Sequence, residues 1–287
     1  MKIGMAFANV GPFVQPEEAV HFARSCEERG LDSLWTVEHV VVPSGYRAQY
    51  PYSPSGRMPG HEDSPIPDPL IWLAYVAGAT RTIKLATGIL ILPQRHPVYT
   101  AKEVATLDRL SGGRVILGIG IGWLKDEFDV LGIPFEERAA RTEEACAALR
   151  TLWKPGAHAF KGEHYRWDAL ESNPKPAQTG GPPIVVGGHV LGAARRAARV
   201  GDGFFPMKTE GSRLRELLDA MSDECAKVGR DPAEIEVTTS TSALDVDSIR
   251  RLEDEGVSRV VVAPPAFDRD GIAKGLDKLA NEIIAKV

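Results

Sequence analysis

The sequence is poor in cysteine, and its few cysteines lie far apart. Its 287 residues include three of them, Cys26, Cys146 and Cys225, and no CxxC motif. The seven histidines do not cluster at metal-ligand spacings either. Disulfide frameworks and structural zinc sites need several such residues at characteristic spacings. We therefore expect three unpaired thiols, a cytoplasmic protein and no metal site.

Long apolar runs and blocks of one charge are also missing. No run approaches the roughly 18 apolar residues that a membrane-spanning helix needs, and the N-terminal MKIGMAFA is more typical of a β-strand than of a signal peptide. The 34 basic and 39 acidic residues give a net charge of −5, without a basic cluster of the kind that binds nucleic acid. We therefore expect neither a membrane nor a nucleic acid as partner.

Common motifs of hydrolases and nucleotide-binding enzymes are absent. There is no GxSxG elbow, no HExxH zinc site and no GxxxxGK[ST] phosphate loop. The run GIGIGW, residues 118–123, begins like the dinucleotide fingerprint GxGxxG, but tryptophan replaces its last glycine. The run also lies in mid-chain, whereas that fingerprint usually follows the first strand of its unit. This argues against a nicotinamide-dependent reductase without excluding it.

What the sequence does contain is a repeated unit of helix end, turn and apolar strand. The apolar runs are rich in β-branched residues and do not alternate with polar ones, as expected for parallel strands covered on both faces. We predict strands over 2–8, 32–37, 84–91, 114–120, 183–187, 203–206, 235–240 and 258–263.

Helices are expected between these strands. Pro16 and Pro97 stand where helices begin, and Gly30 and Gly112 stand just after helix ends. The later helices are predicted near 136–153, 191–200, 212–228, 247–255 and 270–286. Eight βα units in a chain of this length predict an α/β fold, a single (β/α)₈ TIM barrel over residues 1–287.

Two long insertions interrupt this alternation, after the second and fourth strands. Residues 40–68 hold six of the 21 prolines and three of the six tyrosines, Tyr46, Tyr50 and Tyr52. A long segment without periodicity is typical of a functional loop, and after a barrel strand it would lie at the rim that carries active sites. We interpret it as an active-site lid rather than a passive insertion. Residues 154–182 are expected to form a β-hairpin or meander on the exterior or rim.

Two single side chains that follow predicted strands are candidates for chemistry. His39 follows the second strand and could act as an acid or base near pH 7, or serve a structural role. Arg95 follows the third strand and could pair with an anion or only cap the rim.

Glycines after the fourth and fifth strands are candidates for ligand binding. Gly120 and Gly122 could let a planar ligand approach the backbone, or only shape a tight turn. Gly187, Gly188 and His189 precede a predicted helix, where free backbone N–H groups could bind a phosphate. The same glycines could instead only shape a βα turn.

One long block of the sequence resembles the bacterial luciferase-like superfamily. It runs from Thr87-Gly88-Ile89 through Arg95-His96-Pro97 to ATLDRLSGGR (105–114) and LGIGIGW (117–123). The resemblance extends over nearly the whole chain and is strongest to the oxidoreductases that use the deazaflavin coenzyme F420. It implies a TIM barrel that binds a flavin or deazaflavin at the C-terminal ends of its strands.

The resemblance also implies roles for individual residues. It implies a non-prolyl cis peptide between Gly88 and Ile89, in a bulge that supports the central ring of the cofactor. It places the cofactor phosphate on the turn of residues 187–189 and matches His39 to an active-site histidine. Some related sugar-phosphate dehydrogenases carry an acidic residue after strand four, but residues 120–122 of this chain are Gly-Ile-Gly, so that acid is not carried over.

Three functions remain open at this point. With F420, a hydride would move between cofactor and a small organic substrate while His39 handles the proton; with FMN, the enzyme would be an oxygen-dependent monooxygenase. A cofactor-free binding protein or partner subunit is the third function. The segment 40–68 would close over the substrate, and its Arg47 and Arg57 could contact an anionic cofactor tail. A homodimer is expected, since luciferase-like barrels commonly pair.

Overall fold

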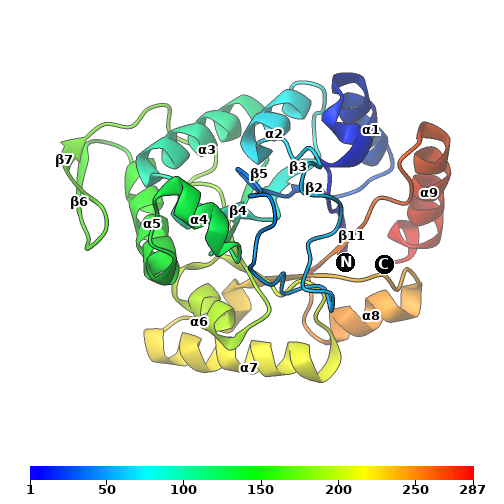
Figure 1. Ribbon diagram of the computed structural model, residues 1–287. Coiled ribbons are helices and arrows are strands. Elements are labelled where there is room, and N and C mark those ends of the chain that lie inside the picture. Colours follow the sequence, from blue (N-terminus) through cyan, green and yellow to red (C-terminus); the bar gives the residue numbers. More distant parts are fainter.

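The computed structural model describes residues 1–287, and its strands form a closed parallel barrel inside a ring of helices (Figure 1). The sheet order is β3-β2-β1-β11-β10-β9-β8-β5-β4, and pairing of β3 with β5 closes it. The predicted (β/α)₈ barrel is therefore confirmed. The barrel strands are β1 (Lys2–Met5), β2 (Ser33–Thr36), β3 (Lys84–Thr87), β4 (Leu90–Ile91), β5 (Val115–Gly120), β8 (Ile184–Gly187), β9 (Gly203–Phe205), β10 (Glu236–Ser240) and β11 (Arg259–Val262).

Two of these strands differ from the predicted ranges. β1 ends at Met5 because the chain leaves the sheet at Phe7, whose φ of 53° lies outside the β region. The third strand is divided into β3 and β4, and both parts pair with β5. From Ala86 to Leu90 the chain advances four residues, while the paired residues on β5, Ile116 and Ile119, are three apart. The extra residue forms a bulge that contains the Gly88–Ile89 peptide, which is cis as the resemblance implies.

Nine α-helices surround the barrel. They are α1 (Pro16–Glu28), α2 (Pro69–Ala77), α3 (Pro97–Ser111), α4 (Lys125–Leu131), α5 (Arg138–Trp153), α6 (Leu191–Val200), α7 (Gly211–Val228), α8 (Val246–Asp254) and α9 (Arg269–Glu282). Short 3₁₀ helices cover Gly11–Val14, Leu92–Gln94, Phe135–Glu137, Pro232–Glu234 and Ile284–Lys286.

The sequence patterns do not reveal α2 and α4. The sequence of α2, PLIWLAYVA, is apolar throughout, so it shows no polar face, and α4 has only seven residues. Asp68 begins α2 as its N-cap and accepts hydrogen bonds from the N–H groups of Leu70 (2.9 Å) and Ile71 (3.0 Å).

The core has an outer and an inner part. A cluster of 54 buried apolar residues fills the space between barrel and helices. Inside the barrel, a smaller cluster includes Trp35 and Phe205, whose rings meet edge to face at 5.2 Å. Because side chains fill the barrel interior, a ligand has to bind at one end of it, as is usual for this fold.

The second insertion contains an antiparallel hairpin, as predicted. Its strands are β6 (His158–Lys161) and β7 (Arg166–Leu170), and Figure 1 shows it outside the ring of helices. The Glu144 carboxylate of α5 accepts hydrogen bonds from the backbone N–H groups at the hairpin turn, residues 163–165. The hairpin is thereby attached to the exterior of the barrel.

The three cysteines are unpaired, as predicted, and the structure shows all three to be buried. Burial raises the pKa of the Cys146 thiol to about 12, so this thiol stays protonated at neutral pH. No helix of the structure has both the length and the apolar character needed to cross a membrane.

Candidate active site

The predicted site residues follow strands that all end at the same side of the barrel. His39 follows β2, Ile89 lies between β3 and β4, Gly120 ends β5 and Gly187 ends β8. β4, β5 and β8 are neighbours in the sheet, with Ile119 of β5 paired to Leu90 on one side and Val186 on the other. The closed parallel barrel therefore brings these residues to one mouth.

Two of the glycines make room for the side chain of Ile89. A Cβ atom on Gly120 would lie 2.5 Å from Cδ1 of Ile89, and one on Gly187 would lie 2.6 Å from its Cγ2. Ile89 itself is half-buried. Its side chain thus lies across the ends of β5 and β8, with part of its surface exposed at the mouth.

The other two glycines are required by the backbone of their turns. Gly122 has φ of 77° and Gly188 has φ of 133°, in a region that side chains disfavour. A Cβ atom on Gly122 would also come within 2.7 Å of the Phe128 ring, and one on Gly188 within 2.8 Å of Ala193. Both positions therefore need glycine for the conformation of their turns.

His39 is held by a buried carboxylate that the sequence patterns did not reveal. Its Nδ1 lies 3.1 Å from Oε2 of Glu127, the third residue of α4, whose side chain has no exposed surface. Oε1 of the same carboxylate accepts hydrogen bonds from the N–H groups of Val40 (2.6 Å) and Val41 (3.2 Å). Nε2 of His39 has no hydrogen-bond partner within the protein, which leaves it available to another group.

The electrostatics of Glu127 favour its ionised form. Burial by itself works to raise the pKa of this carboxyl, but the hydrogen bond and charge of His39 and the Val41 N–H outweigh burial and lower it. The carboxylate is therefore charged at neutral pH. A sequence signal for this pair is lacking, since 88 positions separate the two residues.

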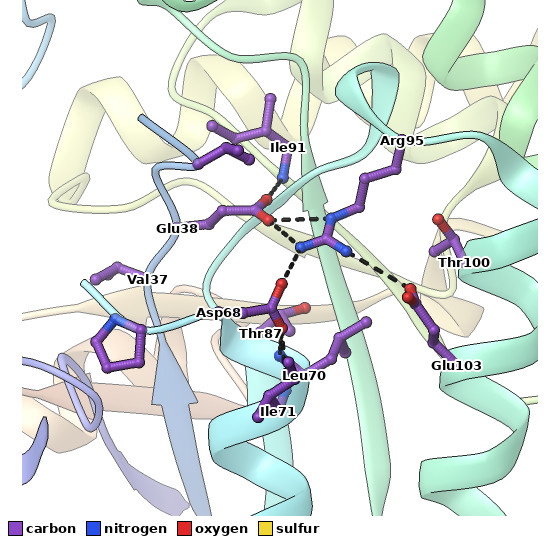
Figure 2. A network of polar contacts seen from close by, with 12 residues as sticks. Val37, Glu38, Asp68, Leu70, Ile71, Thr87, Ile91, Arg95, Thr100 and Glu103 are labelled. Atoms are coloured by element: carbon purple, nitrogen blue, oxygen red, sulfur yellow. Dashed lines mark hydrogen bonds and ion pairs between the residues drawn. The ribbon is translucent and has the colours of Figure 1, made fainter. Parts of the chain in front are cut away.

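Glu38 belongs to a second polar network, shown in Figure 2, in which carboxylates bind the guanidinium of Arg95. The Glu38 carboxylate accepts hydrogen bonds from the Ile91 N–H and from Nε (3.0 Å) and Nη2 (2.5 Å) of Arg95. Nη2 of Arg95 also lies 2.6 Å from Oδ2 of Asp68, and its Nη1 lies 3.5 Å from Oε2 of Glu103. Burial disfavours the charge, but Glu38 and Asp68 raise the pKa of Arg95. Three carboxylates surround Arg95. Its charge is therefore used within the rim of the barrel and is not free to bind an external anion.

The two ends of the segment 40–68 are held side by side. Arg95 contacts both Glu38 and Asp68, just before and at the end of the segment. Asn9, which is fully buried after β1, donates from Nδ2 to the carbonyls of Val37 (2.9 Å) and Pro67 (3.1 Å) and accepts from the Val37 N–H. The segment is thus a long loop with neighbouring ends.

The middle of this segment lies across the mouth, as Figure 1 shows for the blue stretch inside the ring. A chain of aromatic rings connects the two sides. The centroid distances are 5.6 Å from His39 to Trp123, 5.1 Å from Trp123 to Tyr50, 5.5 Å from Tyr50 to Tyr52 and 4.5 Å from Tyr52 to His189. The rings extend from the end of β2 to the turn after β8. Burial, with a contribution from Tyr50, raises the pKa of Tyr52 to about 12.

Tyr46 organises the segment itself. It is buried, its hydroxyl accepts a hydrogen bond from the Met58 N–H (3.0 Å), and its ring lies edge to face with Trp123 at 5.5 Å. Nη1 of Arg57 donates to the Tyr46 carbonyl (2.8 Å), and the guanidinium lies 4.7 Å from the Tyr46 ring centre. Arg47 is 92% exposed, and its Nε is 4.0 Å from Asp126.

The turn after β8 leads into a helix whose N-terminus lacks a side-chain cap. Val190 is the N-cap residue of α6 and makes no capping hydrogen bond. Nη2 of Arg213, near the start of α7, donates to the His189 carbonyl (2.9 Å). Burial and Arg213 lower the pKa of His189, and its Nδ1 is buried without a partner. Arg213 was not identified from the sequence, because only barrel closure brings α7 beside this turn.

Comparisons with known proteins agree with the barrel fold. A family model described as luciferase-like monooxygenase matches residues 4–256. An uncharacterised protein of Mycobacterium tuberculosis is 30% identical over 277 residues, which cover 93% of this chain and 95% of that protein. An F420-dependent glucose-6-phosphate dehydrogenase of Kineococcus radiotolerans is 32% identical over 245 residues, which cover 83% of this chain and 67% of that protein.

Solved structures share the fold at lower identity. The F420-dependent tetrahydromethanopterin reductase of Methanopyrus kandleri has a TM-score of 0.78 at 18% identity, covering 99% of this chain and 98% of its own. An F420-dependent secondary alcohol dehydrogenase with an F420–acetone adduct has a TM-score of 0.77 at 19%, covering 96% and 97%. A monooxygenase of Streptomyces bottropensis has a TM-score of 0.76 at 22%, covering 99% of both chains.

Proposed function

The chain belongs to the luciferase-like monooxygenase family, and from this premise we propose that it is an oxidoreductase in which coenzyme F420 exchanges a hydride with a small organic substrate. The observation that carries the proposal is the composition of one barrel mouth. A histidine with one free ring nitrogen, an apolar side chain over two glycines, and a glycine turn at an uncapped helix lie there together.

These residues fit the parts of a flavin-like cofactor. The exposed part of Ile89, lying over Gly120 and Gly187, offers an apolar support for a planar ring. The turn of Gly188 and His189 fits a phosphate, because an uncapped helix N-terminus binds anions. Arg213 adds a positive charge beside this turn, and the partnerless Nδ1 of His189 offers a polar contact.

In this proposal the bound cofactor supplies hydride chemistry, and His39 handles the proton. Nδ1 of His39 is held by Glu127, so Nε2 is the nitrogen that accepts a proton from a substrate hydroxyl or returns it to a carbonyl. The negative charge of Glu127 stabilises the imidazolium that forms after proton uptake. Glu127 thus acts as a positioning residue.

We assign the segment 40–68 the role of a lid. Its ends are anchored by Asn9 and Arg95, while Tyr50 and Tyr52 reach across the mouth. Closure over a bound substrate would exclude water from the reacting atoms. The aromatic rings would then form the wall on the substrate side.

Titration of the purified protein with F420 and, separately, with FMN tests the cofactor. The fluorescence of each cofactor reports its binding. We expect F420 to bind tightly and FMN to bind weakly. Replacement of His39 by Ala should leave F420 binding intact and lower turnover by about a hundredfold or more, the usual contribution of acid–base catalysis. Unchanged turnover in this variant would remove His39 from the catalytic role.

An FMN-dependent monooxygenase is the second candidate, because the matching family model carries that description. Preferential binding of FMN together with oxygen consumption would favour it. If neither cofactor binds, a cofactor-free binding protein or partner subunit becomes the better explanation.

A further inference from the structure

The basic side chains on the His39 side of the mouth are engaged within the protein. Arg95 is surrounded by Glu38, Asp68 and Glu103. Arg57 is bonded to the Tyr46 carbonyl and stacked on its ring. Lys125, on α4, pairs with Asp129 of its own helix, 2.6 Å away.

The remaining arginine and the nearby helix ends offer no anion site either. Arg47 extends into solvent with 92% of its side chain exposed. The N-terminus of α2 is capped by Asp68, and the first turn of α4 carries Asp126 and Glu127. A phosphate or carboxylate on a substrate needs a free cationic group or a free helix N-terminus for strong hydrogen bonds. This side of the mouth therefore suits an uncharged molecule.

The neighbouring strand ends add no charge. Residues 6–15 after β1 and residues 121–124 after β5 contain no acidic or basic side chain. By contrast, Lys208 and Arg213 follow β9. When the divided strand β3/β4 is counted once, three strands separate β2 from β9 in each direction around the barrel. Arg213 pairs with Glu216 of its own helix (2.5 Å) and donates to the His189 carbonyl, so the basic side chain here that has no ion pair is Lys208. It lies on the side of the 187–189 turn, where the proposed function places the cofactor phosphate.

What the His39 side does offer is an aromatic wall. The rings of Trp123, Tyr50 and Tyr52 follow one another at 5.1 and 5.5 Å, starting beside His39. Aromatic rings bind planar apolar groups by edge and face contacts, but they carry no positive charge for a phosphate. The polar groups with a free position here are Nε2 of His39 and the hydroxyls of Tyr50 and Tyr52, and all three are uncharged in their ordinary neutral forms.

We propose that the substrate is an uncharged alcohol or ketone with a planar apolar part, and that the site discriminates against sugar phosphates. This inference rests on the proposed function. In alcohol oxidation, the carbinol C–H bond breaks and its hydride, with two electrons, passes to the oxidised deazaflavin. The hydroxyl proton passes to Nε2 of His39, and the carbon–oxygen bond becomes a carbonyl.

The test compares molecules that differ in charge. The probes are 1-phenylethanol, its 4-carboxylate derivative and glucose 6-phosphate, measured by calorimetry on the protein with and without oxidised F420. F420 reduction is followed in parallel by absorbance. We expect 1-phenylethanol to bind at least about tenfold more tightly than either anion and to reduce F420. Equal or tighter binding of either anion overturns the proposal.

Variants of the aromatic wall supply the second arm. Tyr50→Ala should lower the affinity for 1-phenylethanol about threefold to tenfold. Tyr50→Phe keeps the ring and should retain the affinity of the wild type. Val228→Ala is the control, because Val228 is the last residue of α7 and is 44% exposed. Unchanged affinity in Tyr50→Ala overturns the proposal.

Two results separate this inference from the proposed function. If F420 fails to bind but 1-phenylethanol binds with the expected dependence on Tyr50, the cofactor assignment is wrong and the substrate class stands. If F420 binds and 1-phenylethanol does not, the substrate class is wrong and the cofactor assignment stands.

Discussion

At the scale of single residues, the contact between His39 and Glu127 determines what the mouth can do chemically. A histidine beside a buried carboxylate has a fixed ring orientation and one engaged nitrogen. The sequence patterns identify His39 by its place after a strand, but its partner lies on a short helix after another strand. The pair is therefore a product of the fold.

Replacing Glu127 by Gln should lower the turnover number with F420 by about tenfold to a hundredfold and leave F420 binding unchanged. The neutral amide removes the charge that stabilises a protonated His39. Steady-state kinetics measure the effect, and ¹⁵N NMR of the ring reports whether the protonated nitrogen has changed. Asp126→Asn is the control, since Asp126 does not contact His39. Turnover and ring shifts equal to those of the wild type would contradict the positioning role.

The lowered pKa of Glu127 leads to a prediction about the stability of the protein in acid. Its pKa is lowered from the ordinary 4.5 in the folded protein, so ionised Glu127 adds stability above that value. This contribution is lost as the pH falls through the lowered pKa. We expect the difference in unfolding free energy between wild type and Glu127→Gln to be largest near neutrality and to shrink in acid. Urea unfolding at several pH values measures it, and a constant difference would contradict it.

At the scale of elements, the bulge between β3 and β4 places Ile89 on the glycines of two neighbouring strands. Gly120→Ala should lower the free energy of unfolding by about 1–3 kcal/mol, because the new Cβ would overlap Cδ1 of Ile89. It should also weaken F420 binding by displacing the side chain that supports the ring. Urea unfolding and F420 titration measure the two effects.

A second substitution shows whether this overlap is the cause. Ile89→Ala in the Gly120→Ala background should recover part of the lost stability, since the smaller side chain removes the overlap. Simple addition of the two destabilisations would indicate that the residues act independently.

The segment 40–68 is the second element with a testable role. Replacing residues 47–62 by a short Gly-Ser linker keeps the anchors at both ends, including Arg95 and Asn9. We expect the melting temperature to change little and F420 turnover to fall strongly, because Tyr50 and Tyr52 of the aromatic wall are removed. A thermal melt and a turnover assay decide the matter. A large loss of stability with normal turnover would identify the segment as structural.

At the scale of the whole molecule, two neighbouring helices carry exposed apolar side chains. Ile71 and Tyr75 of α2 are 72% and 51% exposed, and Tyr99 and Leu110 of α3 are 74% and 77% exposed. Large exposed apolar side chains on adjacent helices are candidates for an interface. We expect a homodimer through this face, with Ile71→Glu shifting the mass measured by light scattering toward the monomer. A Val130→Glu control on α4 should leave the dimer intact.

Much of the fold follows from local sequence patterns. The apolar runs identify all eight barrel strands, and Pro16, Pro97, Gly30 and Gly112 bound their helices close to the observed ends. The helix α2 is not identified from the sequence because it lacks a polar face. The third strand is divided into β3 and β4 because it contains one extra residue relative to β5. These departures arise where a local pattern is uniform or where packing redirects the backbone.

The sequence by itself determined the barrel, the mouth at which His39 and the 187–189 turn lie, and the long segment beside them, because apolar runs and their succession along the chain are properties of the sequence itself. Only the tertiary structure decided which groups meet at the mouth. It paired His39 with Glu127, surrounded Arg95 with carboxylates, and placed Tyr50 on Trp123. These contacts join residues far apart in the chain, and their geometry exists only after the barrel closes and brings the strand ends together.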